Sequence, residues 1–420
     1  MSVLKITGGR TLSGSLRVQG AKNSALPLLA ASVLTEGLSV FRNCPRLTDV
    51  AATVDILRHV GCRVYGEADA LYVDSSGPIR PEVPDDLMRR MRSSVIFLGA
   101  LLSRCGEVTL SLPGGCELGP RPVDLHLAAL RSLGAEVTQE EGRIRCRASR
   151  LRGGSIALGA VSVGATENAM LAAVRASGST IISGAAKEPE IVDLQDYLRS
   201  CGALVTGAGS SVIRIRGVEK LRSGEKRILP DRIAAATYLA ACASAGGRIR
   251  LYDASPGDMV PILRTLERMG CRVKTGENLI VLERKGPLVS PGPIITRPHP
   301  GFPTDAQPPI MASVLKARGT TVMIETIFES RFRHVPALCT MGADIRTAGK
   351  TAVIRGVETL RGASVLASDL RGGAALAVAA LAAEGETEIR GMEHVLRGYE
   401  DMAGALTALG AEARLVETAG

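Results

Sequence analysis

Residues 112–126, with the sequence LPGGCELGPRPVDLH, are the segment whose residue types point most clearly to chemistry. The segment places one thiol, Cys116, after two glycines and five residues before Arg121. Paired glycines let a backbone approach a ligand closely, and a nearby cation favours the reactive thiolate. From the residues alone, an incidental surface cysteine stays an alternative, because cysteine is also a common core residue.

A second group of polar residues lies at the start of each of six Ala-rich segments that we expect to be helices. The group comprises residues 22–23, 92–93, 162–167, 231–232, 304–305 and 369–371. Helix N-termini carry unpaired N–H groups and partial positive charge, which suit phosphates and carboxylates. Helix capping alone explains Thr304 and Asp231.

Capping does not explain the cations at these helix starts. Four are present: Lys22, Arg92, Arg232 and Arg371. A cation opposes the helix dipole at this end, so the four side chains predict a site for anions. Charged turns at residues 187–190, 329–334 and 394–400 extend the pattern, although solvated loop charge explains any one of them. Together the sets predict a pocket for a multiply anionic small molecule, since arginine matches carboxylate and phosphate.

These side chains must be positioned by a repeated element. The pattern Leu-x-x-x-Gly ends six apparent helices, at Gly61, Gly134, Gly202, Gly270, Gly342 and Gly410. A second series ends the Ala-rich helices at Gly37, Gly106, Gly178, Gly246, Gly319 and Gly385. Strand-like runs follow both series, as expected when glycine stops a helix. A period of about 70 residues predicts six copies of one α/β unit, each reading helix, strand, helix, strand, strand.

Composition narrows the class of protein. The 420 residues carry a net charge of +9, 3% aromatic residues and nine cysteines without a Cys-x-x-Cys pair. This argues against structural zinc and disulfides and is typical of the cytoplasm. The few aromatics and dispersed cations disfavour nucleic acid, and no apolar run is long enough to cross a membrane. We find no phosphate-binding loop or dinucleotide fingerprint.

Several segments resemble the UDP-N-acetylglucosamine enolpyruvyl transferases. They are residues 22–26, 112–126, 162–166, 188–193, 302–305, 328–332 and 397–399. The similarity runs from about residue 5 to residue 412, and the Pro-Gly-Gly-Cys loop with Arg-Pro-Val-Asp-Leu-His is highly specific. The resemblance implies an α/β fold, a two-domain inside-out α/β barrel of six βαβαββ-type units, three per domain. The expected domains are 22–229, which carries the Cys116 loop, and 1–21 plus 230–420, with the ligand cleft between them.

The resemblance also implies the reaction. The family moves enolpyruvate from phosphoenolpyruvate to the 3′-hydroxyl of UDP-N-acetylglucosamine and releases phosphate, the first committed step of peptidoglycan precursor synthesis. It implies no metal and no organic cofactor. Cys116 corresponds to the loop cysteine that forms an adduct with phosphoenolpyruvate and is alkylated by fosfomycin. The sequence leaves the oligomeric state open and is compatible with a monomer.

Residue by residue, the resemblance implies a role for each motif. Lys22, Arg121 and Arg397 would hold phosphoenolpyruvate, and Arg92 and Arg331 would complete the anion pocket. Asp305, with Asn23, would meet the sugar and act as the base for its hydroxyl. Arg371 and Asp369 would lie beside the reacting centre, with Arg232 among the substrate-binding residues. The nucleotide would contact Arg121, Pro122, Val123, Asp124, Leu125, Ser162, Val163, Gly164 and Ile327.

One position departs from the family pattern, and three other functions stay open. Ala160 stands where several members place a basic residue that reaches the nucleotide. The alternatives are a 3-phosphoshikimate 1-carboxyvinyltransferase, which lacks the Pro-Gly-Gly-Cys loop, a non-catalytic sugar-nucleotide-binding regulatory paralogue, and a basic nucleic-acid-binding module. Retention of Lys22, Cys116, Asp305 and Arg397 disfavours the paralogue.

Overall fold

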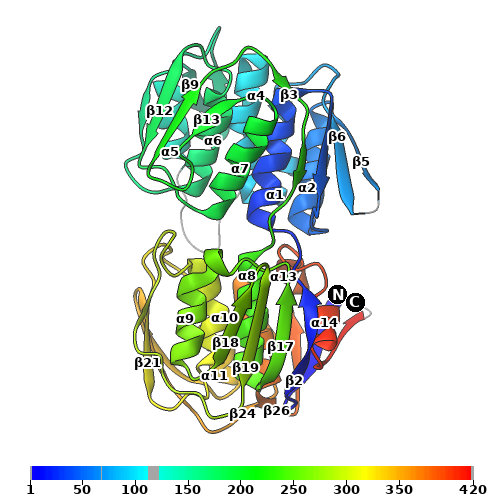
Figure 1. Ribbon diagram of the computed structural model, residues 1–420, viewed down its shortest axis with the longest axis vertical. Coiled ribbons are helices and arrows are strands. Elements are labelled where there is room, and N and C mark those ends of the chain that lie inside the picture. Colours follow the sequence, from blue (N-terminus) through cyan, green and yellow to red (C-terminus); the bar gives the residue numbers. More distant parts are fainter. Residues whose placement is uncertain (1, 68, 112–122, 418–420) are drawn as a thin grey trace. The chain divides into compact units, whose positions relative to one another are not determined.

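The computed structural model describes residues 2–67, 69–111 and 123–417. The described chain forms two compact units (Figure 1). The N-unit comprises residues 20–67, 69–111 and 123–229, and the C-unit joins residues 2–19 to residues 230–417. Each unit has its own hydrophobic core, and each is described by itself below.

The N-unit contains three four-stranded sheets. In sheet order they are β16(Glu225–Arg227)-β4(Leu38–Arg42)-β6(Ala70–Asp74)-β5(Arg63–Glu67), β7(Glu82–Val83)-β8(Glu107–Ser111)-β10(Arg143–Arg147)-β9(Glu136–Glu140) and β11(Ser155–Ala157)-β12(Ser179–Ser183)-β14(Val212–Arg216)-β13(Leu204–Thr206). The Ala-rich helices are α1(Lys22–Ala31) with the 3-10 turn η1(Ser32–Leu34), α4(Phe97–Cys105) after η2(Arg92–Ile96), and α6(Val163–Ala173). The remaining elements are α2(Thr48–His59), α3(Asp85–Arg90), α5(Asp124–Ser132), α7(Pro189–Ser200) and the pair β3(Thr35–Glu36)-β15(Leu221–Arg222).

The C-unit also contains three four-stranded sheets. They are β2(Leu12–Arg17)-β17(Gly247–Tyr252)-β19(Leu279–Arg284)-β18(Arg272–Gly276), β20(Ile294–Ile295)-β21(Thr320–Ile324)-β23(Thr351–Arg355)-β22(Asp344–Ala348) and β25(Ser364–Leu366)-β27(Glu386–Arg390)-β1(Ser2–Thr7)-β28(Glu412–Glu417). The Ala-rich helices are α8(Arg232–Ala245), α10(Gln307–Ser313) after η4(Thr304–Ala306), and α12(Leu370–Leu381). The remaining elements are η3(Pro256–Met259), α9(Val260–Arg268), α11(Val335–Thr340), α13(Met392–Val395), α14(Met402–Ala408) and the pair β24(Leu360–Arg361)-β26(Ala383–Glu384).

All six sheets share one pairing pattern, which confirms the sixfold repeat. In each, the first edge strand runs parallel to its neighbour, and the other two pairs are antiparallel. Two of the C-unit sheets are completed from the start of the chain, because β2 pairs with β17 and β1 lies between β27 and β28. The described strands form separate sheets and not one closed barrel.

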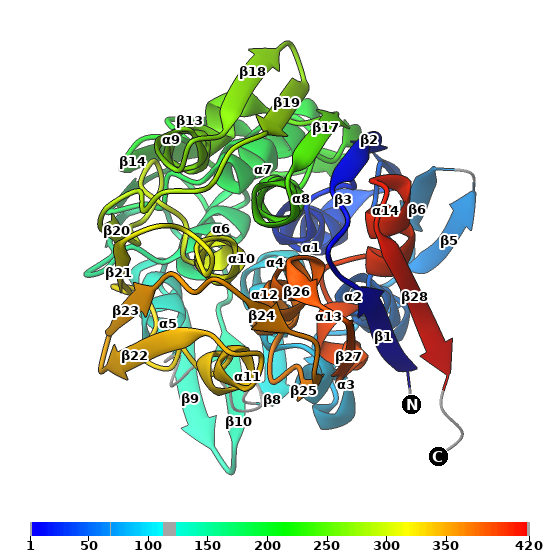
Figure 2. The ribbon, with the colours of Figure 1, turned by 90° about the horizontal axis from the view of Figure 1, so that it is seen from below.

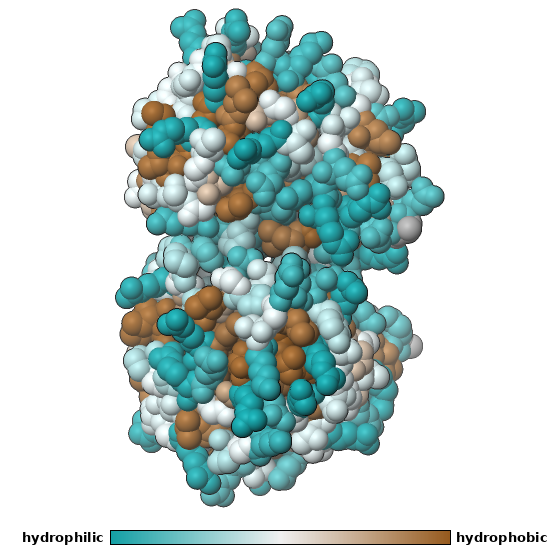
Figure 3. Space-filling view, viewed as in Figure 1, coloured by the Kyte–Doolittle hydropathy of each residue, from teal (hydrophilic) through white to brown (hydrophobic). Residues whose placement is uncertain are grey.

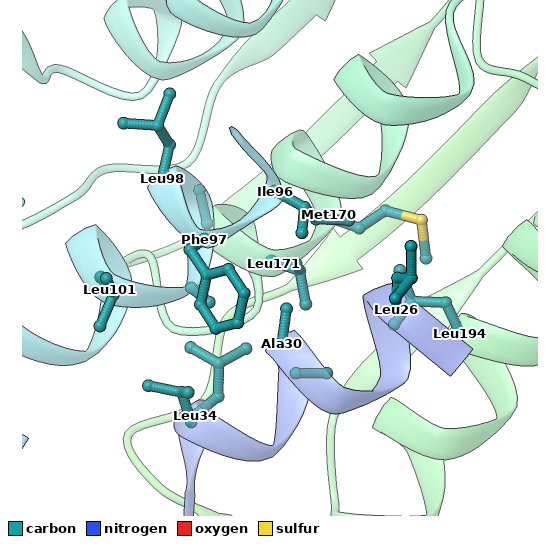
Figure 4. Close-up of a cluster of buried hydrophobic side chains, with 14 of the residues drawn as sticks. Leu26, Ala30, Leu34, Ile96, Phe97, Leu98, Leu101, Met170, Leu171 and Leu194 are labelled. Carbon is teal, nitrogen blue, oxygen red and sulfur yellow. The ribbon is translucent and has the colours of Figure 1, made fainter. Parts of the chain in front are cut away.

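The Ala-rich helices lie inside and the sheets outside. Figure 2 shows α8, α10 and α12 side by side with the C-unit strands around them. Every residue of α8 from Arg232 to Ser244 is buried, because its alanines let neighbouring helices approach on several sides. In the N-unit, side chains of α1, η1, η2, α4, α6 and α7 belong to one buried hydrophobic cluster (Figure 4). Hydrophilic side chains cover most of the face drawn in Figure 3, with small separate hydrophobic areas.

The Leu-x-x-x-Gly signature is a helix stop. All six of its glycines have positive φ, from 85° at Gly134 to 110° at Gly61. In each copy the N–H after the glycine donates to the carbonyl of the signature leucine, as Cys62 does to Leu57 at 2.9 Å. This 6→1 bond is the Schellman motif, so the repeated pattern encodes one local structure six times.

The second glycine series is only partly a helix stop. All six glycines have positive φ, but only α4 and α8 end directly at one, Gly106 and Gly246. The other four helices end earlier, because residues before the glycine form a short parallel pairing with an incoming segment. Examples are β3 with β15 and the Arg152–Ser177 bridge.

Candidate active site

The predicted site residues lie at helix starts, as their sequence positions indicated. Lys22 opens α1, Arg92 opens η2, and Arg232 follows Asp231, the N-cap of α8. Ser162 caps α6 by accepting from Ala165 N at 3.3 Å, and Val163 and Gly164 form its first turn. Asp369 caps α12 through Arg371 N and Gly372 N at 3.0 and 2.9 Å.

Asp305 of η4 is held by two arginines from other elements. Arg331 Nη2 lies 2.8 Å from Asp305 Oδ1, and Arg371 Nη2 lies 3.2 Å from Oδ2. The two arginine side chains are 2% and 3% exposed, whereas the Asp305 side chain is 27% exposed. The carboxylate is therefore the solvent-reaching member of a buried cationic cluster.

The Arg371 end of this cluster reaches α8. Arg371 Nη1 lies 3.4 Å from the Tyr399 hydroxyl, which lies 2.7 Å from Thr237 Oγ1. Burial is the largest single effect and would lower the pKa of Arg371, but the charge of Asp305 together with Tyr399 and Asp231 outweighs it and the pKa is raised. A hydrogen-bonded chain thus joins the N-terminal parts of α8, η4 and α12, and Arg371 stays charged.

The Arg331 end holds the η4 backbone. Arg331 donates to the Thr304 carbonyl from Nε and Nη2, at 3.2 and 2.9 Å, and its guanidinium lies 5.5 Å from the Phe328 ring centroid.

The helix-capping prediction is right for Asp231, which accepts from Ile233 N and Ala234 N. It is wrong for Thr304, whose hydroxyl donates to Glu325 Oε2 at 2.9 Å, because a buried carboxylate lies within reach.

Lys22 lies in a corresponding ion pair of the N-unit. Its Nζ is 2.7 Å from Asp49 Oδ2, with Lys22 12% and Asp49 3% exposed. Asn23, the next residue, is half-buried. Carboxylates of the chain itself therefore pair with Lys22 and Arg371, and the same ammonium and guanidinium groups have the donors to meet an anion.

The nucleotide-binding prediction covers two described stretches of the N-unit. Asp124 is exposed and opens α5, while Val123 and Leu125 pack on the core. His126 is buried, with Nδ1 2.7 Å from Asn168 Nδ2 of α6, and a Cβ on Gly164 would lie 3.0 Å from its ring. His126 therefore ties α5 to the start of α6, which is a holding role and not that of a triad base.

The other predicted residues are placed as follows. Arg397 is half-buried between α13 and α14, and Ile327 is 39% exposed in the turn after β21. Ala160 is exposed two residues before the α6 cap. Cys116, Arg121 and Pro122 lie outside the described residues. Among the described residues, no group of three or more His, Cys, Asp or Glu is placed to hold a metal ion.

Two buried polar residues next to the Asp305 cluster, Thr237 and Glu325, were missed by the sequence reasoning. Two others, His334 and Tyr399, lie in the predicted charged turns 329–334 and 394–400 but were given no role of their own. The signal at Glu325 was an acid directly after an apolar strand run, which is a costly place for a charge unless it is hydrogen-bonded.

Within the described ranges 2–67, 69–111 and 123–417, no helix is both long and apolar enough to span a membrane.

Several known proteins are similar to this chain over nearly its full length. The family model described as EPSP synthase (3-phosphoshikimate 1-carboxyvinyltransferase) matches residues 6–406. UDP-N-acetylglucosamine 1-carboxyvinyltransferase 2 of Caldanaerobacter subterraneus is 49% identical over 98% of this chain and 99% of its own. The UDP-N-acetylglucosamine 1-carboxyvinyltransferase of Dichelobacter nodosus is 46% identical over 100% of both chains.

Solved structures give the same architecture. The enolpyruvyl transferase NikO from Streptomyces tendae superimposes with a TM-score of 0.87 at 27% identity, covering 99% of this chain and 98% of that one. EPSP synthase from Acinetobacter baumannii reaches 0.77 at 19% identity over 99% and 100%, which supports the fold alone. Fold and site thus define an enolpyruvyl transferase, which confirms the predicted fold class. Within that class the chain belongs to the UDP-N-acetylglucosamine 1-carboxyvinyltransferase family.

Proposed function

We propose that the protein transfers the enolpyruvyl group of phosphoenolpyruvate to the 3′-hydroxyl of UDP-N-acetylglucosamine and releases phosphate. The observation that carries the proposal is the full-length similarity to relatives of that name, at 49% and 46% identity. The Asp305 cluster supports it independently, because it presents one carboxylate against two buried arginines.

The chemistry needs two proton movements in the addition step. The acceptor hydroxyl loses a proton as its oxygen bonds to C2 of phosphoenolpyruvate, and the methylene carbon gains a proton. Loss of a methyl proton then expels phosphate and restores the double bond. Asp305 is the proposed base for the hydroxyl, since its carboxylate reaches solvent while Arg331 and Arg371 hold its orientation. Cys116 is the proposed proton donor and the site of a pyruvate-type adduct.

The arginines and lysine serve the anions. Lys22, Arg121 and Arg397 are proposed to bind the phosphate and carboxylate of phosphoenolpyruvate, with Arg92 and Arg331 completing the pocket. Buried cations stabilise the charge that develops on the departing phosphate, and arginine matches its geometry in a bidentate manner. Arg232, Asn23, Asp369 and Ile327 remain proposed substrate contacts.

The cellular assignment follows from this reaction. The product would be the first committed precursor of peptidoglycan, and the protein would act in the cytoplasm on small molecules, without nucleic acid, metal or organic cofactor. Fosfomycin would alkylate Cys116 and block the enzyme. Acceptor-dependent release of phosphate from phosphoenolpyruvate tests the proposal, with shikimate 3-phosphate as the competing acceptor.

A further inference from the structure

Glu325 is a buried carboxylate for which the proposed reaction has no direct use. It follows β21 and is 1% exposed, and it lies 20 residues after Asp305 in the sequence. Burying a carboxylate is costly unless hydrogen bonds replace its water. Its hydrogen-bond partners therefore indicate which segments of the chain the carboxylate holds in place.

Four donors surround the Glu325 carboxylate. Oε1 accepts from Thr296 Oγ1 at 2.9 Å, from Ile327 N at 2.7 Å and from Phe328 N at 3.1 Å. Oε2 accepts from Thr304 Oγ1 at 2.9 Å. Both oxygens are thus satisfied, and one side chain fixes three segments: the end of β20, the turn after β21 and the start of η4.

Two of these segments carry proposed site residues. Thr304 directly precedes Asp305, and Ile327–Phe328 form the turn that leads to Arg331. Arg331 joins these two segments directly, because it donates both to the Thr304 carbonyl and to Asp305 Oδ1. Thr304 is therefore held at two points: its side-chain hydroxyl donates to Glu325, and its backbone carbonyl accepts from Arg331.

We propose that Glu325 is a positioning residue for catalysis: through Thr304 it fixes the η4 turn that aims the Asp305 carboxylate at the acceptor hydroxyl. The proposal rests on the proposed function. A misplacement of about 1 Å at a reacting group costs on the order of 100-fold in rate, so loss of this anchor lowers kcat. Substrate affinity changes little when only the Thr304 link is cut, because the Glu325 bonds to the turn that leads to Arg331 remain in place.

The test compares four variants by kcat and by KM for both substrates. Glu325→Ala removes the acceptor for all four donors and is expected to lower kcat about 10- to 100-fold. Glu325→Gln keeps the shape, since its amide oxygen accepts at the Oε1 position and its amide nitrogen donates to Thr304 Oγ1. It is expected to recover kcat to within about 5-fold of the unmodified enzyme. Thr304→Val cuts only the link to η4 and is expected to lower kcat about 10-fold with KM within about 3-fold.

Thr326→Val is the matched control. Its hydroxyl donates to the Thr296 carbonyl at 2.6 Å in the same turn but does not contact η4, so kcat should match the unmodified enzyme. An unchanged kcat in Thr304→Val overturns the proposal, and so does a fall of kcat in Thr326→Val equal to that in Thr304→Val. If Glu325→Ala does not fold, Thr304→Val alone decides the question. A lack of turnover in the unmodified enzyme would instead refute the proposed function.

Discussion

Arg371 and Asp305 join the starts of two central helices of the C-unit, with Arg371 Nη2 3.2 Å from Asp305 Oδ2. The two residues are 66 positions apart in the sequence. Arg371 is 3% exposed, and the same guanidinium reaches the Tyr399 hydroxyl. This pair fixes the orientation of the carboxylate, which a base for an acceptor hydroxyl requires.

Breaking this pair should cost both stability and activity. Arg371→Ala leaves a partly buried carboxylate with one cation fewer, so the free energy of unfolding should fall by about 3 kcal/mol, with a large loss of kcat/KM. Arg414→Ala is the control, because its 2.8 Å pair with Glu386 is 57% and 37% exposed and such pairs contribute about 0–1 kcal/mol. Urea unfolding and steady-state kinetics measure both. Equal effects of the two substitutions would show that Arg371 has no special role in stability or activity.

Fosfomycin should modify one cysteine. Burial raises the pKa of Cys62 and Cys242 to about 12, and of Cys146 and Cys271 to about 11, so these thiols are poor nucleophiles. Intact mass spectrometry should show a single adduct on the unmodified protein and none on Cys116→Asp. Cys339 is exposed, so Cys339→Ser is the matched control and should still gain the adduct. An adduct on Cys116→Asp would contradict the assignment.

His334 should make stability fall in mild acid. Burial lowers its pKa from 6.5 to about 4, although Asp369 opposes the shift. Between these values the unfolded chain binds a proton that the folded protein does not, so stability decreases as pH falls from 6.5 to 4. The expected loss is about 3 kcal/mol, since one pKa unit corresponds to about 1.4 kcal/mol.

The measurement is the free energy of urea unfolding at several pH values. His334→Gln should flatten its dependence between pH 6.5 and 4 relative to the unmodified protein. A slope that persists in His334→Gln would assign the acid sensitivity to other groups.

The helix stop after α7 gives a test of the repeat. Gly202 has φ of 100°, and a Cβ there would meet nothing within 4 Å, so strain is the main cost of a side chain. Gly202→Ala should destabilise the protein by about 1–2 kcal/mol. A Cβ on Gly159 would also meet nothing, and its φ lies outside the left-handed region. Gly159→Ala should therefore stay within about 0.5 kcal/mol. Equal thermal stability of the two variants would refute the strain argument.

The repeat was predictable because its signal is local. Leu198 and Gly202 form the α7 stop by one bond between residues five apart, Ala203 N to the Leu198 carbonyl, and such motifs have a fixed sequence spacing. The early end of α6 was not predictable, because it depends on the Arg152–Ser177 bridge between separate segments.

Individual residues of the candidate site were predictable, but the contacts between them were not. Charges at helix starts identified Lys22 and Arg371, because cations are unfavourable there, whereas the family resemblance identified Asp305. Their partners come from long-range packing: Asp49 lies on α2, and Arg331 and Glu325 lie in turns that only the assembled sheet brings to η4. No spacing rule connects these positions.

The most direct test of the account measures phosphate released from phosphoenolpyruvate by the purified protein, with UDP-N-acetylglucosamine or shikimate 3-phosphate as acceptor. The account predicts release that requires UDP-N-acetylglucosamine, does not occur with shikimate 3-phosphate, and falls at least about 100-fold in Asp305→Asn. Release with shikimate 3-phosphate alone, or with neither acceptor, would contradict it.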